Sequence, residues 1–264
     1  MLISGTNIAK DVCAKLHKTI LTHGLTPHLA VILVGSLDAS KMYVNMKQKK
    51  AEELDITCNI HRFPDNVIEI DLLDTIRSLN SDPSVHGIMI QLPLPKHLNE
   101  QLILNNININ KDVDGLTGKG IFTSCTSMAC IELIKTIFPI LKGLLASVVG
   151  ACGVVGSQVA QLLAKEGCTV IMVDRYSKDP QPLTRQSDIL VVACGNPNLI
   201  TTDWVSEKTI VIDVGINKVD GKVCGDADFD GLKDKVKAIT PVPGGVGPMT
   251  IAMLMSNTVK AAQM

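Results

Sequence analysis

The stretch Val148-Val149-Gly150-Ala151-Cys152-Gly153-Val154-Val155-Gly156 decides the fold of this 264-residue chain. It follows a predicted strand at 146–149 and opens a predicted helix at 155–165, and its glycines have the spacing G-x-x-G-x-x-G. Glycines at such a turn let the backbone approach a pyrophosphate, and the first N–H groups of the helix face the anion. The strict G-x-G-x-x-G pattern is absent, so a tight turn without a ligand is the alternative interpretation.

Asp174 favours the dinucleotide interpretation. It ends the next predicted strand, which begins at Thr169, and an acid at that place accepts hydrogen bonds from ribose hydroxyls. The alternative is that Asp174 only caps the start of a helix and touches no coenzyme.

Strand-like and helix-like segments alternate in both halves of the chain, which predicts an α/β fold with parallel sheets and crossover helices. The predicted helices of the first half are 8–22, 39–54, 67–79 and 99–106, and its strands are 29–34, 57–63 and 87–92. In the second half we predict helix 125–137, strands 189–193 and 209–214, and a final helix at 249–263. We therefore predict two domains: an N-terminal α/β domain at 1–117 and a Rossmann-like domain at 118–248. The C-terminal helix, 249–264, is expected to pack back on the first domain.

The composition excludes several classes of protein. Hydrophobic residues make up 46% and charged residues 19%, which permits a large core and argues against disorder. A net charge of −1 argues against a nucleic-acid partner. The apolar runs are strand-length and residues 1–10 do not resemble a secretory signal, so we expect no membrane association. The eight cysteines form no C-x-x-C pair, which predicts small buried thiols in a reducing, cytoplasmic compartment.

Ser40, Tyr43 and Lys47 have spacings of three and four, so they share one face of a predicted helix. A lysine that points into a binding site loses its charge readily, and it can then polarise an oxygen or hold a water molecule. An ordinary surface lysine beside an amphipathic tyrosine is the alternative interpretation.

Further polar residues lie where strands end. Gln91 ends the strand that precedes Leu92-Pro93-Leu94-Pro95, and Asp112 and Asp114 lie in a turn-rich loop. Ligands of open α/β sheets bind beyond the carboxyl ends of the strands. The two aspartates fit turn and cap positions equally well. A metal site formed by the two carboxylates is a further alternative, but no histidine lies nearby at a ligand spacing, so we expect no metal.

The segment Thr240–Thr250 contains three prolines and three glycines between 241 and 248, which define a rigid backbone path before the last helix. Such a loop is either a structural crossover or a binding loop that exposes backbone donors at fixed positions.

Taken together, these motifs resemble the bifunctional methylenetetrahydrofolate dehydrogenase/cyclohydrolase family over nearly the whole chain. They occur in order as Gly35…Ala39-Ser40-x-x-Tyr43-Val44-x-x-Lys47, His86-Gly87-Ile88…Gln91-Leu92-Pro93-Leu94-Pro95, Lys111-Asp112-Val113-Asp114-Gly115, Asp213-Val214-Gly215-Ile216-Asn217, Gly225-Asp226 and Pro241–Thr250.

The resemblance implies two α/β domains with a cleft between them, usually in a homodimer. It also implies oxidation of 5,10-methylenetetrahydrofolate with NAD or NADP and hydrolysis of the methenyl product to 10-formyltetrahydrofolate. Two alternatives remain: a cyclohydrolase with weak or lost dehydrogenase activity, and a non-catalytic protein that binds folate or nucleotide.

The resemblance also implies the roles of individual residues. Lys47 is the catalytic lysine, Gln91 tunes it, Tyr43 stacks near the aminobenzoyl ring of the folate, and Asp114 binds the pterin. Further substrate contacts fall at Pro243, Gly244 and Gly245. The implied coenzyme residues are Gly150, Ala151, Cys152, Gly153, Gly156, Asp174, Arg175, Ile216 and Thr250.

Departures from the family pattern lie on the coenzyme side. The family's Gly-Arg-Ser is Gly150-Ala151-Cys152 here, its Cys-Thr-Pro-x-Gly is Cys125-Thr126-Ser127-Met128-Ala129, and its His-Pro-x-Asn after Gly115 is missing. The family pattern favours NADP. The carboxylate of Asp174 would repel a 2′-phosphate, so the local residues favour NAD, although Arg175 could offset the repulsion. We predict a preference for NAD.

Overall fold

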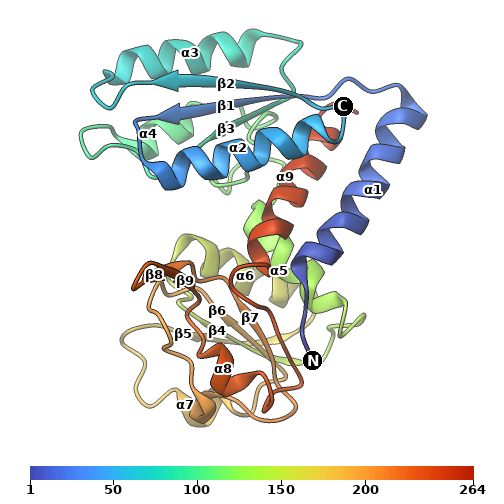
Figure 1. Cartoon of the computed structure of the whole chain (residues 1–264), viewed down its shortest axis with the longest axis vertical. Helices are drawn as coiled ribbons and strands as arrows, with labels where there is room; N and C mark the ends of the chain where they lie inside the picture. Colours follow the sequence, from blue (N-terminus) through green and yellow to red (C-terminus); the bar gives the residue numbers. More distant parts are fainter. The chain divides into compact units, whose positions relative to one another are not determined.

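The structure, a computed structural model, describes residues 1–264 and divides them into two compact units (Figure 1). Unit 1 comprises Met1–Lys10 and Thr126–Thr250, and unit 2 comprises Asp11–Cys125 and Ile251–Met264. The division near Cys125 lies later in the chain than the predicted 117/118 boundary.

The first ten residues belong to unit 1, which the sequence did not predict. Leu2 forms a parallel bridge with Ile239, and the N–H of Ile3 donates to the Ile239 carbonyl at 2.9 Å. The chain start therefore extends the edge of the unit 1 sheet through backbone pairing, which leaves no periodic signal in the sequence.

Unit 2 contains a three-stranded parallel sheet in the order β2-β1-β3. In chain order its elements are α1 (Gly5–His23, whose first residues belong to unit 1), β1 (His28–Val34), α2 (Asp38–Glu52), β2 (Thr57–Phe63), α3 (Glu69–Ser81), β3 (Gly87–Ile90), α4 (Glu100–Asn105) and most of α9 (Val246–Ala261). The predicted strand 87–92 ends at Ile90, because Leu92 and Pro93 enter the proline-rich segment that follows.

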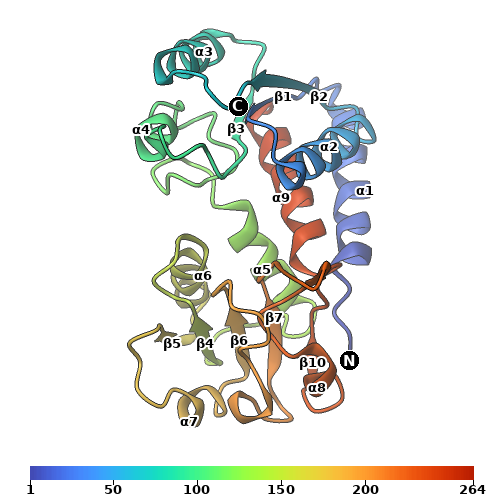
Figure 2. The same ribbon diagram turned by 60° about the vertical axis from the view of Figure 1, so that its left-hand side comes forward.

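Alternation along β1 separates two faces of this sheet. Ala30, Ile32 and Val34 pack in one buried cluster with apolar residues of α3 and α4. The odd-numbered residues of β1 are also buried and point to the opposite face. Helix α2 lies on that opposite face (Figures 1 and 2), and this placement directs one side of α2 toward the sheet.

Unit 1 contains a five-stranded parallel sheet in the order β10-β7-β6-β4-β5 and a separate hairpin, β8-β9. In chain order its elements are α5 (Cys125–Lys135, from the unit boundary), β4 (Leu145–Val149), α6 (Val154–Lys165), β5 (Thr169–Val173), α7 (Gln181–Thr184), β6 (Ile189–Val192), η1 (Thr202–Trp204), β7 (Ile210–Asp213), β8 (Asn217–Val219), β9 (Lys222–Cys224), α8 (Phe229–Leu232) and β10 (Ala238–Ile239). The short elements α7, η1, β8, β9, α8 and β10 were not predicted, because segments of two to four residues show no period.

The strand order reverses between β4 and β6, which is the switch point of a doubly wound sheet. Helix α6 covers one face of the sheet, and α7 and α8 lie on the other (Figures 1 and 2). The carboxyl ends of β4 and β6 therefore border the position where such folds bind ligands. None of the helices in either unit is long and apolar enough to cross a membrane.

Asn257 of α9 ties this helix to the segment that contains Asp114. Its side chain is 1% exposed and donates to the carbonyls of Val113, at 2.8 Å, and Thr123, at 3.1 Å. Both amide N–H groups of the side chain are used in this way, so the contact fixes the backbone on either side of the loop.

We expect Asn257→Ala to lower the free energy of unfolding by about 1–3 kcal/mol, because the carbonyls of Val113 and Thr123 lose the hydrogen bonds from the buried amide. Urea denaturation measures this change. The exposed Asn66, truncated as Asn66→Ala, is the matched control and should stay close to wild type. Equal midpoints for the two variants would contradict the expectation.

Candidate functional site

The glycine turn of unit 1 brings three backbone segments into close contact. Gly150 has φ +88°, and a Cβ placed on it would lie 2.2 Å from the carbonyl oxygen of Ala193. A Cβ on Gly156 would lie 2.2 Å from the carbonyl oxygen of Gly150. Both positions therefore require glycine. Helix α6 begins directly after the turn, at Val154, and its first N–H groups have no hydrogen-bond acceptor within the helix.

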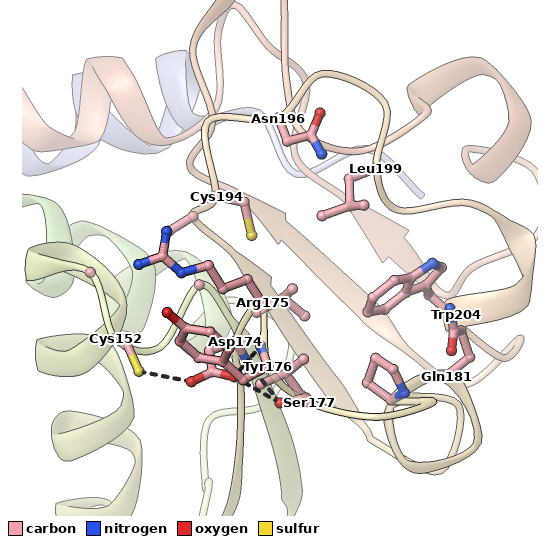
Figure 3. Close-up of a pocket in the computed structure, with 16 residues that line it drawn as sticks. Cys152, Asp174, Arg175, Tyr176, Ser177, Gln181, Cys194, Asn196, Leu199 and Trp204 are labelled. Carbon is pink, nitrogen blue, oxygen red and sulfur yellow. Dashed lines mark hydrogen bonds between the residues drawn. The ribbon is translucent and has the colours of Figure 1, made fainter.

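A pocket of about 680 Å³ opens beside this turn, at the carboxyl ends of β4, β5 and β6 (Figure 3). Its lining residues are Val149, Gly150, Cys152, Gly153, Val173, Asp174, Arg175, Tyr176, Ser177, Pro180, Gln181, Ala193, Cys194, Asn196, Leu199 and Trp204. This volume lies within the range of small-molecule sites.

Of the coenzyme residues implied by the resemblance, five line this pocket: Gly150, Cys152, Gly153, Asp174 and Arg175. The other four are absent from its lining. Among these, Ala151 is buried and its N–H donates to the Val173 carbonyl at 3.1 Å, Gly156 lies within α6, Ile216 is exposed, and Thr250 lies within α9.

Asp174 both shapes a turn and faces the pocket. One carboxylate oxygen accepts from the Tyr176 N–H at 2.9 Å and the Ser177 hydroxyl at 3.2 Å. The other accepts from the Cys152 thiol at 3.2 Å (Figure 3). These bonds, the Tyr176 N–H foremost, hold the pKa of Asp174 below its usual value, so the pocket contains a fixed negative charge.

Residues on the opposite side of the pocket were missed by the sequence analysis. Figure 3 shows Cys194, Asn196, Leu199 and Trp204 across from Asp174, on the segments that follow β6. In the sequence these four residues share only their position after a predicted strand. That position does not show which side chains point into the pocket. Cys152 and Cys194 are exposed, so the prediction of buried thiols is wrong for these two residues, because both occupy turns rather than strand interiors.

Lys47 lies on the core-facing side of α2. The buried residues of this helix are Ser40, Val44, Lys47 and Ala51, a spacing that forms one stripe along the helix. Lys47 is only 8% exposed, so it is not the ordinary surface lysine of the alternative interpretation.

Two uncharged acceptors hold the amine of Lys47. Its Nζ donates to Gln91 Oε1 at 2.9 Å and to Met89 Sδ at 3.3 Å. Gln91 is itself fixed, because its Nε2 donates to the Leu92 carbonyl at 2.7 Å. Neither acceptor carries a charge to balance an ammonium group, and a thioether is a weak acceptor.

Burial lowers the pKa of Lys47 from the ordinary 10.5, and the negative charge of Asp114 opposes this shift. Burial likewise raises the pKa of Asp114, while Lys47 opposes that change. The two residues therefore lie close enough to interact electrostatically, and desolvation disfavours the charged form of each. A lysine of this kind supplies a neutral amine at lower pH than a surface lysine does.

Asp112 and Asp114 have different surroundings. Asp112 is 2% exposed and accepts from the Gly115 N–H at 3.1 Å and the Thr117 hydroxyl at 2.6 Å. Its carboxylate holds the loop together, whereas Asp114 is more exposed and interacts with Lys47. Tyr43, one turn before Lys47 on α2, is half-buried, and burial raises the pKa of its hydroxyl.

The loop after β10 is held by the start of the chain. Gly244 has φ +108°, and its carbonyl accepts from the Thr6 N–H at 3.0 Å. A Cβ on Gly5 would lie 1.8 Å from the Gly245 oxygen. This contact fixes the backbone of the implied substrate residues Pro243, Gly244 and Gly245.

A doubly wound domain with a glycine-rich turn beside a pocket, and a second α/β domain with a buried lysine, define a two-domain α/β protein of the dinucleotide-binding class. Family comparisons give the particular family. "Tetrahydrofolate dehydrogenase/cyclohydrolase, catalytic domain" matches residues 3–114, and the NAD(P)-binding domain of the same family matches residues 124–264. The chain belongs to the tetrahydrofolate dehydrogenase/cyclohydrolase family.

Similar proteins span the chain from end to end. The bifunctional protein FolD of Wolbachia sp. subsp. Drosophila simulans is 45% identical, covering 99% of this chain and 95% of its own length. The crystal structure of FolD from Campylobacter jejuni is 41% identical with a TM-score of 0.95, covering 100% and 98%. The Trypanosoma brucei FolD structure, complexed with NADP cofactor and inhibitor, is 32% identical with a TM-score of 0.93, covering 100% and 97%.

We expect Lys47 to titrate below 10.5, the ordinary pKa of a lysine, when its side-chain nitrogen is followed by NMR in lysine-labelled protein. Gln91→Glu should raise its pKa by about 1–3 pH units, because a carboxylate replaces a neutral acceptor against the amine. Asn45→Asp, which adds a charge on the exposed side of α2, should leave the pKa nearly unchanged. A Lys47 pKa that does not move in Gln91→Glu would contradict the assigned contact.

Proposed function

We propose that this chain oxidises 5,10-methylenetetrahydrofolate with a nicotinamide coenzyme and hydrolyses the methenyl product to 10-formyltetrahydrofolate. The observation that carries the proposal is the buried Lys47 amine held by Gln91, in a chain that also contains a dinucleotide pocket. A protein that only bound folate or nucleotide would not need a desolvated lysine, so this pair disfavours the non-catalytic alternative.

The residues of unit 1 fit a nicotinamide coenzyme. The glycines of the turn leave no room for side chains and expose backbone where a pyrophosphate would lie, and the N-terminus of α6 favours an anion. The carboxylate of Asp174 can accept hydrogen bonds from the free hydroxyls of the ribose. The glycine turn and Asp174 would hold the coenzyme, which would supply a hydride acceptor for the methylene carbon of the folate.

Hydrolysis uses the residues of unit 2. Water adds to the methenyl carbon, and the Lys47 amine takes a proton from that water as the new carbon–oxygen bond forms. The ring then opens as the bond from that carbon to one of its two nitrogens breaks and the hydroxyl proton passes to the departing nitrogen, which leaves the formyl carbonyl. Lys47 releases the proton that it took to solvent. Gln91 orients the amine, and the lowered pKa of Lys47 keeps it available as a base.

Folate binding is assigned to residues near Lys47 and to the loop of unit 1. The carboxylate of Asp114 would accept from the adjacent ring N–H and amino groups of the pterin, a charge-assisted pair. Tyr43 would stack near the aminobenzoyl ring. Pro243, Gly244 and Gly245 would contribute backbone contacts.

We further propose that NAD is the preferred coenzyme. The fixed carboxylate of Asp174 lies in the pocket, and the residues that would replace the family's Arg and Ser are the buried Ala151 and the uncharged Cys152. Arg175 lines the same pocket but stacks on the Tyr176 ring at 5.1 Å, which engages its guanidinium. We also propose that the protein is a homodimer, which the family pattern supports. We propose a cytoplasmic location, which the eight free cysteines support.

We expect Lys47→Met to lower cyclohydrolase activity by roughly 100-fold or more, because the general base is lost. The rate of methenyltetrahydrofolate hydrolysis measures this directly. Lys49→Met, on the exposed side of the same helix, is the control and should keep the wild-type rate. A folded Lys47→Met protein that hydrolyses at the wild-type rate would show that the assignment of Lys47 is wrong.

The kcat/KM of the dehydrogenase is expected to be higher with NAD than with NADP. Asp174→Ser should improve kcat/KM for NADP by roughly fivefold or more, because two charges about 4 Å apart repel by about 1 kcal/mol even in water. Asp203→Ser removes an exposed acid outside the pocket lining and should change neither value.

Two results would contradict this proposal. A tenfold preference of the wild type for NADP, unchanged in Asp174→Ser, would exclude the role of Asp174. Inactivity with both coenzymes together with normal hydrolysis would instead indicate a cyclohydrolase that has lost its dehydrogenase activity.

A further inference from the structure

Two motifs of the sequence, Asp213-Val214-Gly215-Ile216-Asn217 and Gly225-Asp226, each contain a buried aspartate that has no role in the function described so far. The structure brings them together. A Cβ on Gly215 would lie 2.3 Å from the Asp226 carboxyl carbon, and a Cβ on Gly225 would lie 1.9 Å from Asp213 Oδ2. Each glycine therefore leaves the space that the aspartate of the other motif occupies.

Asp213 fixes the backbone of the second motif. It is 3% exposed, and its carboxylate accepts from the N–H groups of Gly215 at 2.9 Å, Asp226 at 3.0 Å and Ala227 at 2.8 Å. Burial raises the pKa of Asp213 to about 6, although the three hydrogen bonds act to lower this pKa. Its acceptors are thus used to hold the chain around Asp226 in place.

The carboxylate of Asp226 points to the loop after β6. It is fully buried, and Oδ2 accepts from the N–H groups of Cys194 at 2.6 Å and Gly195 at 2.9 Å. Its Oδ1 accepts from the Asn217 side chain at 2.8 Å, which connects β8 to the same carboxylate. Every contact of Asp226 lies within unit 1.

These bonds orient a peptide group that borders the coenzyme pocket. Ala193 and Cys194 line the pocket, and Figure 3 shows Cys194 across from Asp174. In a trans peptide the carbonyl points opposite to the N–H. With the Cys194 N–H held by Asp226, the Ala193 carbonyl is directed away from Asp226 and packs against Gly150 of the glycine turn, as the Gly150 contact shows.

We propose that Asp226 is a positioning residue for the coenzyme: it sets the backbone of Ala193–Gly195, which forms one side of the pocket and packs against Gly150. This inference rests on the proposed function, since it concerns binding of the nicotinamide coenzyme. Asp226 touches no coenzyme itself. Its effect passes through the peptide groups that it holds.

Asp226→Ala removes the acceptor of two backbone N–H groups and is expected to raise the KM for the coenzyme roughly tenfold or more, with a much smaller change in kcat. Asp226→Asn keeps an oxygen that can face the same N–H groups, and Asn217 can turn its own oxygen toward the new amide. We therefore expect this conservative variant to restore most of the affinity. Methenyltetrahydrofolate hydrolysis, which needs no coenzyme, should stay at the wild-type rate in both.

Asp188 supplies the matched control. It also accepts a backbone N–H in unit 1, that of Leu145 at 3.0 Å, but at the amino end of β4, away from the pocket. Asp188→Ala is expected to lower the melting temperature without changing the KM for the coenzyme. Binding of NAD and NADP is read independently of turnover from the fluorescence of Trp204, the only tryptophan, which lines the pocket.

A folded Asp226→Ala protein with wild-type coenzyme affinity would overturn the proposal, as would an equal rise in KM in Asp188→Ala. If Asp226→Ala does not fold, the pair Asp226→Ser and Asp188→Ser decides, because the shorter serine side chain cannot reach the Cys194 and Gly195 N–H groups. A weaker coenzyme affinity in Asp226→Ser alone supports the proposal, and equal affinities refute it. A wild type that binds coenzyme by fluorescence but shows no dehydrogenase activity would refute the proposed function and leave this test intact.

Discussion

The hydrolysis proposed for this chain depends on a lysine amine that is buried without a charged hydrogen-bond partner. Lys47 is held by the amide oxygen of Gln91 and the sulfur of Met89, neither of which stabilises an ammonium as a carboxylate in contact would. Desolvation is therefore the dominant influence on its pKa, and Asp114 offsets only part of it. If Lys47 were on the exposed side of α2, the same residue would be a fully charged surface lysine with no use as a base.

Unit 1 depends on a different constraint, the close approach of backbone to backbone. Gly150 and Gly156 permit the turn between β4 and α6, and Gly215 and Gly225 make room for two buried carboxylates. At each of these four places a single methyl group would collide with a neighbouring atom. Part of the pocket wall is therefore backbone, and hydrogen bonds from its N–H groups to a buried carboxylate fix the shape of the pocket at the switch point of the sheet.

Much of this arrangement follows from local sequence. The periodicity of α2 places Ser40, Val44 and Lys47 on one stripe, and the strand positions follow from buried apolar runs such as 29–34. Between 174 and 240 the predicted strands 189–193 and 209–214 are confirmed as β6 and β7, which are apolar and buried, whereas the other helices and strands of that range span two to four residues and were not predicted. The residues Trp204 and Cys194 were missed for the same reason: their place in the pocket depends on the path of these short elements.

The sequence by itself determined the two α/β domains, the glycine turn and the set of polar residues at strand ends. Each of these features depends on the types and spacing of residues within a short segment of the chain. Only the tertiary structure decided which face of α2 is buried, and thus whether the Lys47 amine is desolvated or a solvated charge. It also decided that Asp112 holds a loop while Asp114 interacts with Lys47, and that Asp226 reaches the loop after β6. These outcomes depend on contacts between residues far apart in the chain, and no local pattern specifies which buried carboxylate meets which backbone N–H.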